Sequence, residues 1–217
     1  MTDGTIVRLG EFDRIDRYFK PLATNPEISL NLTDDAAILS PQSGFDQVIS
    51  TDTLVEGVHF IKDTDPHKLG QKLLRVNLSD MAGMGAKPLC YFLSLSLPHR
   101  TLETWLHGFS DGLMRDQTTF DLSLAGGDTT STDGPLVLSL TMIGLVPAGK
   151  ALRRNAGQAG DAIFVSGTIG DGHLGLMAAQ GGLGGLSGAA HDHLVKRYEL
   201  PNPRVTLGRT LVDAGAR

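Results

Sequence analysis

Cysteine is almost absent from this chain. Its 217 residues include a single one, Cys90, so no disulfide can form within the chain. Such sparing use of cysteine is typical of a reducing compartment. No apolar run approaches the ~18 residues of a membrane-spanning helix, and the opening segment, MTDGTIVRLGEFDRIDRYF, has no apolar signal-peptide core. We therefore expect a cytoplasmic protein without a membrane partner.

Basic residues are also too few and too scattered to form a stripe. The chain has 19 Lys and Arg against 24 Asp and Glu, a net charge of −5. A nucleic-acid partner is therefore not expected. The hydrophobic content of 41% is that of an ordinary globular protein, and 217 residues allow one or two domains with a sizeable core.

Hydrophobic periodicity predicts alternating helices and strands. The segments 90–97 and 136–146 alternate apolar and polar residues, which favours a mixed or antiparallel sheet over a fully buried parallel one. Thr101 is the expected N-cap of a helix over 101–115. The expected helices are 9–20, 66–85, 101–115, 191–199 and 204–217, with another opened by GTIGDGHLGL; the expected strands are 46–50, 90–97, 120–125, 136–146 and 162–166.

A change of composition divides the chain. The segment 147–160, PAGKALRRNAGQAG, is rich in Gly and Ala and is typical of a domain junction. We predict an N-terminal domain over 1–148 and the beginning of an incomplete α/β domain over 149–217. The stretch 181–190, GGLGGLSGAA, is expected to be a flexible loop.

Five carboxylates have no Lys or Arg within two positions. They are Asp34 and Asp35 in LTDDAAIL, Asp52 in ISTDTLVEGVHF, Asp80 in VNLSDMAGMG and Asp128 in LAGGDTT. Carboxylates among small residues suit Mg²⁺, which prefers oxygen ligands. Several of them converging in space would fit a site for ATP–Mg²⁺ phosphoryl transfer.

Each of these residues also has a purely structural interpretation. Asp52 would close a hairpin turn after its strand, and Asp80, spaced to lie on the apolar stripe of its helix, would cap that helix. Gly126–Gly127–Asp128 would form either a common turn or a close backbone approach to a phosphate. His59 would be a structural or a substrate-binding residue, and Arg153–Arg154 a phosphate clamp or solvated linker charge.

Several segments occur in the order known from one enzyme family. They are GEFDRIDRYF, TDDAAIL, ISTDTLVEGVHF, KLLRVNLSDMAGMGAKP, LAGGDTT, GKALRR and VSGTIGD. From about residue 10 onward the chain resembles the thiamine-monophosphate kinases, within the larger family that includes aminoimidazole ribonucleotide synthetase and selenophosphate synthetase. The resemblance implies a two-domain α/β fold whose N-terminal domain forms a barrel-like homodimer.

The resemblance also implies a reaction and a set of site residues. The γ-phosphoryl group of ATP would pass directly to thiamine monophosphate, giving thiamine diphosphate. His59 would contact the thiamine phosphate. By the same likeness Mg²⁺ would be held by Asp35, Ser50, Thr51, Asp52, Asp80 and Asp128, and ATP by Gly127, Asp128 and Arg154.

The chain departs from the family pattern in two places. Asn31-Leu32-Thr33 stands where the family has glycines before the Asp pair; Asn31 can adopt a positive φ, whereas Thr33 cannot do so cheaply. The chain also ends before the family's second acidic motif, D-x-S-D-G, so we expect a longer natural chain, a deletion variant or a shortened protein. Two other functions remain open: another ATP-using synthetase of the larger family, and an inactive nucleotide-binding dimerisation module.

Overall fold

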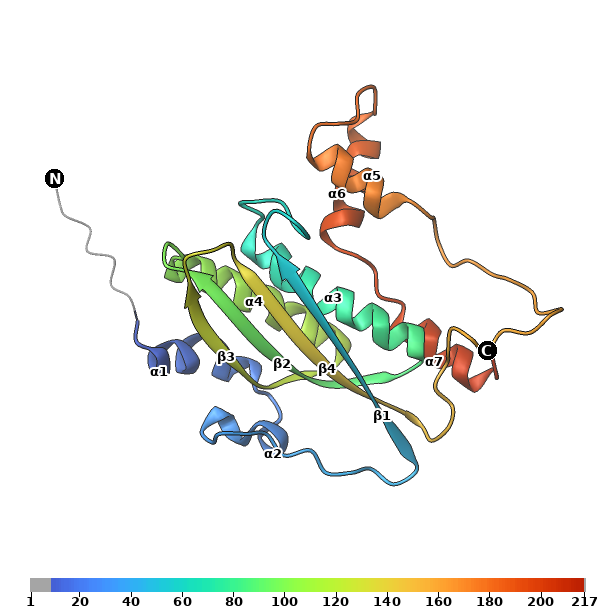
Figure 1. The fold of residues 1–217 in the computed structure, drawn as a ribbon, viewed down its shortest axis with the longest axis horizontal. Helices are drawn as coiled ribbons and strands as arrows, with labels where there is room; N and C mark the ends of the chain where they lie inside the picture. Colours follow the sequence, from blue (N-terminus) through green and yellow to red (C-terminus); the bar gives the residue numbers. More distant parts are fainter. Residues whose placement is uncertain (1–8, 217) are drawn as a thin grey trace.

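A four-stranded sheet forms the centre of the molecule in the computed structural model, which describes residues 9–216 (Figure 1). Residues 1–8 of the predicted first domain and Arg217 lie outside the described part. The strand order is β1-β4-β2-β3. β4 is antiparallel to β1 and to β2, while β2 is parallel to β3, so the predicted mixed sheet is confirmed. The strands are β1 (Phe45–Val55), β2 (Lys87–Pro98), β3 (Ser123–Thr132) and β4 (Val137–Pro147).

Helices α3 (Pro66–Met84) and α4 (Glu103–Phe120) cover one face of this sheet (Figure 1). The Asp65 carboxylate caps α3 by accepting from the backbone N–H groups of His67 and Lys68, and Gly85 ends the helix in a left-handed conformation. Both expected helices are confirmed. The N-cap of α4 is Leu102, not Thr101, because the Leu102 carbonyl is the first to accept from the helix, from the N–H groups of Trp105 and Leu106.

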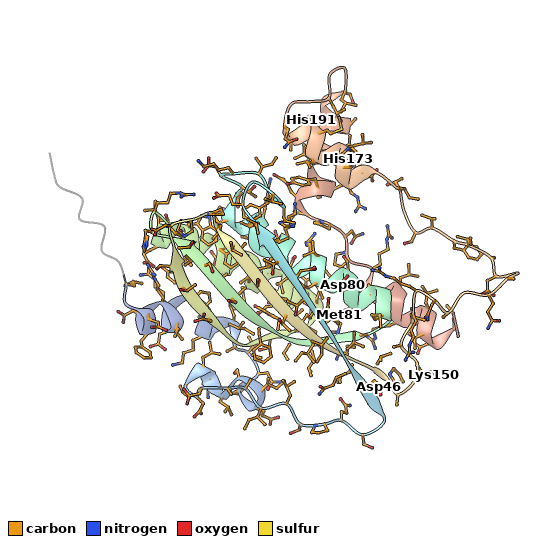
Figure 2. All side chains as sticks on the ribbon, viewed as in Figure 1. Asp46, Asp80, Met81, Lys150, His173 and His191 are labelled. Atoms are coloured by element: carbon orange, nitrogen blue, oxygen red, sulfur yellow. The ribbon has the colours of Figure 1, made fainter. Side chains whose placement is uncertain are left out.

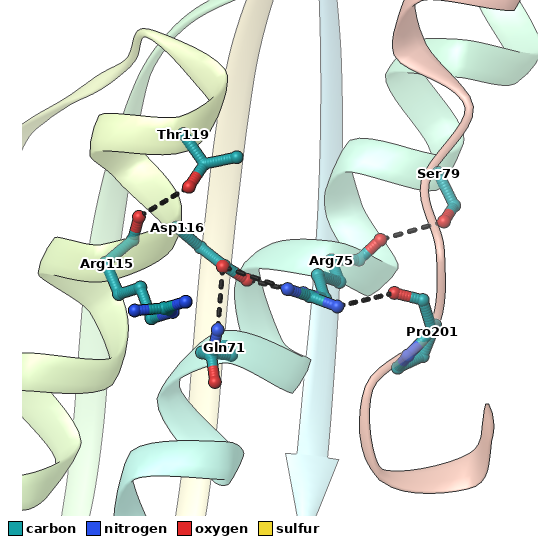
Figure 3. Close-up of polar contacts among 7 residues, drawn as sticks. All are labelled: Gln71, Arg75, Ser79, Arg115, Asp116, Thr119 and Pro201. Carbon is teal, nitrogen blue, oxygen red and sulfur yellow. Dashed lines mark hydrogen bonds and ion pairs between the residues drawn. The ribbon is translucent and has the colours of Figure 1, made fainter. Parts of the chain in front are cut away.

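A buried ion pair joins the two helices. Arg75 Nε donates to Asp116 Oδ2 at 2.5 Å, and Gln71 Nε2 donates to Asp116 Oδ1 at 2.8 Å (Figure 3). The same guanidinium reaches the Pro201 carbonyl at 3.4 Å. Asp116 is 1% exposed, and the Arg75 guanidinium and the Gln71 amide compensate its buried charge.

The N-terminal segment is helical as expected, but not uniformly. α1 (Glu11–Arg14) continues into a π-turn over Ile15–Phe19 and a 3₁₀ turn over Lys20–Leu22. The prediction of this helix rested on the helical spacing of Leu9, Phe12, Ile15 and Phe19 as an apolar stripe, but Phe12 is 81% exposed. The short helix α2 (Pro26–Ser29) and the 3₁₀ turn Leu30–Leu32 then lead toward the sheet.

Beyond β4 the chain is helical. α5 (Asp171–Ala179) packs on α6 (Gly188–Glu199), and α7 (Val205–Asp213) lies against the end of α3 (Figure 1). The predicted strand 162–166 is wrong: Phe164 is 89% exposed, and no described strand runs beside the segment to supply a hydrogen-bonding ladder. The predicted loop 181–190 is shorter than expected, since Ser187 caps α6.

Two expected strand ends are also wrong. β1 continues through Ser50–Asp52 to Val55, and β3 begins only at Ser123 and runs through Gly126–Asp128. Backbone pairing with β4 and with β2 continues over both stretches, which is why neither forms a turn. The domain boundary at 148–149 stays a prediction.

Candidate functional site

Ser50, Asp52 and Asp80 gather where β1 crosses the C-terminal half of α3. The Ser50 hydroxyl donates to Asp80 Oδ2 at 2.6 Å. Asp52, two residues further along β1, is half-buried on the same face of the strand, because side chains alternate along a strand. Figure 2 labels Asp80 on α3, beside the ribbon of β1. We call these three residues the acidic cluster.

Asp80 is exposed, so its predicted place on the buried stripe is wrong. The buried row of α3 runs through Leu73, Asn77 and Met81. Val76, four residues before Asp80, is itself only half-buried, so the predicted stripe turns away from the sheet at this point. An exposed carboxylate here is free to meet a ligand.

The two carboxylates of the acidic cluster repel each other. Burial raises the pKa of Asp52 above its usual range, and the nearby Asp80 carboxylate raises that pKa further, while His59 opposes the shift. Two carboxylates that repel each other in this way are stabilised by a bound cation. The donor set, two carboxylates and a hydroxyl, is one that a hard cation prefers.

Thr51 points away from the acidic cluster. Its hydroxyl is hydrogen-bonded to the Thr141 hydroxyl at 2.8 Å, on the opposite face of the sheet. Of the Thr51 oxygens, only the backbone carbonyl could therefore act as a metal ligand in the acidic cluster. Three consecutive oxygen-bearing side chains in a strand cannot share one site.

His59 follows β1 in a tight turn. The Val55 N–H donates to its Nδ1 at 3.1 Å, and the ring is otherwise exposed. The ring is thus tied to Val55, three residues beyond Asp52 on β1, and it lowers the pKa of Asp52. The structure therefore brings Ser50, Asp52, His59 and Asp80 together.

A second group of predicted residues lines a cavity of about 760 Å³ at the β3 edge of the sheet. Asp34 and Asp35 are exposed at its rim, and Gly126, Gly127 and Asp128 form part of its wall. Its apolar lining includes Ile15, Phe19, Leu32, Phe92 and Leu124. The cavity is large enough for a nucleotide-sized ligand.

Backbone geometry around this cavity explains some of the sequence. A Cβ on Gly127 would lie 2.0 Å from the Leu93 carbonyl oxygen, so only glycine fits there. Asn31 adopts a φ of 57°, as predicted, but Leu30 and Leu32 are also left-handed, at 50° and 56°. Thr33 avoids this region, at −107°. Two leucines in the left-handed region cost roughly 1–2 kcal/mol each.

Arg14 is a cavity residue that the sequence did not reveal, and Glu103 holds its guanidinium. Arg14 lines the cavity, and its guanidinium donates to Glu103 Oε1 at 2.7 Å. Burial raises the pKa of Glu103, but the Arg14 guanidinium outweighs it and, with the Leu9 N–H that donates to the same Oε1, holds that pKa below its usual range. The partners are 89 residues apart in sequence, so no local pattern could have paired them.

The two groups lie at opposite edges of the sheet. One row of paired positions crosses the sheet: Asp52 on β1 pairs with Leu140 on β4, Leu140 with Leu93 on β2, and Leu93 with Gly127 on β3. Three strand spacings separate the ends of this row by about 14 Å. Within residues 9–216 no three His, Cys, Asp or Glu side chains are grouped to hold one metal ion. Arg154 is exposed in a turn and does not line the cavity.

The chain belongs to a defined family. Residues 33–146 match the family described as AIR synthase related protein, N-terminal domain. This match includes the acidic cluster and the glycine-rich wall of the cavity.

Within that family the similarities are to thiamine-monophosphate kinases. The chain is 44% identical to such a protein from Caulobacter vibrioides over 91% of this chain and 55% of that protein. A crystal structure of thiamine-monophosphate kinase from Stenotrophomonas maltophilia K279a matches with a TM-score of 0.80 and 44% identity, over 94% of this chain and 65% of that one. A structure described as AaThiL complexed with AMPPCP and TMP matches with a TM-score of 0.72 and 27% identity, over 94% of this chain and 64% of that one. The chain thus spans less than two thirds of each.

No helix in the described part of the chain is both long and apolar enough to cross a membrane.

Proposed function

We propose that this chain carries out ATP-dependent phosphorylation of thiamine monophosphate to thiamine diphosphate, as a kinase whose acceptor is a phosphate group. The observation that carries the proposal is the acidic cluster, in which Ser50, Asp52 and Asp80 meet with mutually repelling carboxylates. The relative complexed with AMPPCP and TMP supports the choice of both substrates.

The acidic cluster supports Mg²⁺ binding. Its oxygens fit a hard cation, and a cation would relieve the repulsion that raises the pKa of Asp52. When bound, Mg²⁺ would neutralise the triphosphate and the acceptor phosphate, two anions that otherwise repel. The proposed ligands are Asp35, Ser50, Asp52, Asp80 and Asp128, with Thr51 acting through its backbone carbonyl.

The cavity at the β3 edge supports ATP binding. Gly127 lets a phosphate approach the backbone, the apolar lining suits a base, and Asp128 stands in the same wall. We assign Gly127 and Asp128 to ATP. Arg154 would join them only if its exposed turn bends toward the cavity when the nucleotide binds.

The chain's own part in the reaction is to hold both substrates and their counterions in line. The acceptor oxygen belongs to a phosphate that is ionised at neutral pH, so no strong general base is needed. Positioning and charge neutralisation are then the main requirements of phosphoryl transfer. His59 would contact thiamine monophosphate beside the acidic cluster.

We also propose a homodimer. Asp52 and Asp128 lie on opposite edge strands, and both edges are unpaired within residues 9–216. A second copy would pair with these edges and bring the two groups of residues together across the interface. The use of ATP and the single cysteine support the cytoplasm as the place of action.

The test is formation of thiamine diphosphate from thiamine monophosphate, ATP and Mg²⁺ by this chain and by its Asp80→Asn variant. Removing the charge of a direct metal ligand should lower turnover by more than the roughly 10- to 100-fold typical of outer-shell partners. Asp80 is exposed and its described contact is one hydroxyl, so thermal stability should be nearly unchanged.

Asp111→Asn on α4 is the matched control, because it makes the same change at another exposed helical carboxylate. It should leave turnover unchanged. Full turnover in Asp80→Asn would remove Asp80 from the site. If the unmodified chain binds ATP but forms no thiamine diphosphate, it is a nucleotide-binding module instead.

A further inference from the structure

One face of the N-terminal helical segment forms a wall of the cavity at the β3 edge. The residues of this face follow the spacing of neighbours on a helix surface, and they are Glu11, Arg14, Ile15 and Phe19. Arg14 ends α1, and its backbone N–H donates to the Gly10 carbonyl at 3.0 Å. Its side chain is only 21% exposed. The helix therefore directs the Arg14 guanidinium toward the cavity.

Glu103 fixes that guanidinium through a single oxygen. Arg14 Nε and Nη2 donate to Glu103 Oε1 at 3.0 and 2.7 Å, and the Leu9 N–H donates to the same oxygen at 3.4 Å. Glu103 is the first residue of α4, where the helix dipole stabilises a negative charge. The N–H groups of Arg14 Nη1 are left over, and within residues 9–216 they form no hydrogen bond.

The charges around the cavity limit what those N–H groups would bind. Of the described residues that line it, four carry carboxylates and Arg14 alone is basic. Glu103 does not line the cavity, so the ion pair turns its positive end inward. A nucleotide phosphate can meet the carboxylates only through a cation, whereas Arg14 can donate to it directly. The four carboxylates belong to Glu11, Asp34, Asp35 and Asp128.

We propose that Arg14, held in place by Glu103, donates its remaining N–H groups to a phosphate of the bound nucleotide. The identification of this nucleotide as ATP rests on the proposed function. Arg14 is then a phosphate-binding residue that needs no metal ion, and Glu103 is a positioning residue that acts through it. The contact would come from the helical wall of the cavity, across from Gly127 and Asp128 on β3.

The test compares the dissociation constants of ATP and adenosine for the unmodified chain and for Arg14→Gln, by titration calorimetry with Mg²⁺ present. ATP should bind about 10- to 100-fold more weakly to the variant, because a hydrogen bond between two charged groups is lost. Adenosine has no phosphate, so its affinity should be unchanged, which also shows that the cavity is intact. No loss for ATP, or an equal loss for both ligands, would overturn the proposal.

Arg115→Gln on α4 is the matched control. Arg115 is exposed and does not line the cavity, so neither affinity should change. Thermal unfolding of each variant checks that it is folded.

The positioning role of Glu103 is tested by combining variants. Glu103→Gln leaves the Arg14 guanidinium less firmly held, so ATP should bind several-fold more weakly and adenosine as before. Adding Glu103→Gln to Arg14→Gln should cause no further loss of ATP affinity, because Glu103 acts only through Arg14. A purely structural Glu103 would weaken the binding of both ligands and would add its effect to that of Arg14→Gln. Additive losses would therefore contradict the positioning role.

Binding and turnover are separate readouts, so this proposal and the kinase assignment can fail independently. If the chain forms no thiamine diphosphate but its ATP affinity depends on Arg14, the kinase assignment fails and the Arg14 contact stands. If thiamine diphosphate is formed and Arg14→Gln binds ATP as well as the unmodified chain does, the contact is wrong and the kinase assignment stands. An unmodified chain that binds no ATP would also refute the contact.

Discussion

Lys72 is a buried lysine outside the site whose pKa is strongly lowered. It lies on α3, is 6% exposed, and its ammonium nitrogen sits 3.5 Å from the centre of the Tyr198 ring on α6. Burial lowers its pKa to about 8, although Glu199 opposes the shift. Lys68 Nζ pairs with that same Glu199 at 2.6 Å. Charged groups therefore fix the end of α6 on α3.

Lys72 should make stability depend on pH. The unfolded chain holds this proton up to a pKa of about 10.4, whereas the folded chain releases it near pH 8. Between these values the unfolded state binds more protons, so the free energy of unfolding rises with pH through that window. We expect it to rise by about 2 kcal/mol relative to Lys72→Met between pH 8 and 10. Urea titrations of both chains across this range measure the difference, and parallel curves would contradict the assignment.

At single residues, the sequence indicated which side chains suit a metal or phosphate site, but it predicted less well which of them are buried. Asp52, Asp80 and His59 were singled out by composition, since acids without basic neighbours and a histidine near them are visible in a sequence, and their roles in a site stay predictions. The exposure of Asp80 was missed because the turn of α3 away from the sheet depends on packing. Lys72 and Glu103 were missed because their partners lie far along the chain.

At the scale of elements, the sequence predicted what is local and missed what depends on neighbours. α3 has a proline at its first turn, a capping Asp65 and a terminal Gly85, so its predicted bounds are nearly those observed. β1 and β3 were predicted to end early, because Ser, Thr and Gly are common in turns. Pairing with β4 and β2 overrides that preference. The segment around Phe164 has strand composition but no described neighbour to pair with.

Gly208 sets how closely α7 approaches α3. A Cβ there would lie 2.1 Å from the Ala82 carbonyl oxygen, and this backbone oxygen cannot move aside. Gly208→Ala should therefore displace α7 and destabilise the protein by about 1–3 kcal/mol. Thermal unfolding measures the loss, and limited proteolysis checks that the α7 end becomes more accessible.

Gly172→Ala on α5 is the matched control for this substitution. Its added Cβ meets nothing within 4 Å, so only the better helix propensity of Ala remains, worth up to about 1 kcal/mol in its favour. The two Gly→Ala changes should therefore move stability in opposite directions. If Gly208→Ala proved as stable as Gly172→Ala, the close α3–α7 crossing would not be maintained in solution.

At the scale of the molecule, the face of the sheet opposite α3 and α4 is consistent with closure by a second copy, since α2 and the segment after it cover only the part around Cys90, Ala125 and Ile143. That face carries hydroxyls paired across strands, Thr51 with Thr141 and Thr53 with Ser139, at 2.8 and 2.6 Å. Ile49 on the same face is 61% exposed. β1 runs parallel to β3, so a twofold axis along the strands would place β1 beside the partner's β3. Two such sheets give eight strands, a barrel size that side chains can fill.

This arrangement predicts that each active site uses Asp52 of one copy and the partner's Asp128. Asp52→Asn and Asp128→Asn should each abolish turnover alone, since either change empties part of both sites. Mixed after unfolding and refolding, half of the dimers would hold one of each variant, with one of two sites intact, so about a quarter of full activity should return. Sedimentation of each variant first checks that dimers form. If the mixture stays inactive while both variants are dimeric, the two carboxylates do not meet across the interface, and the 14 Å row within one chain must be closed in another way.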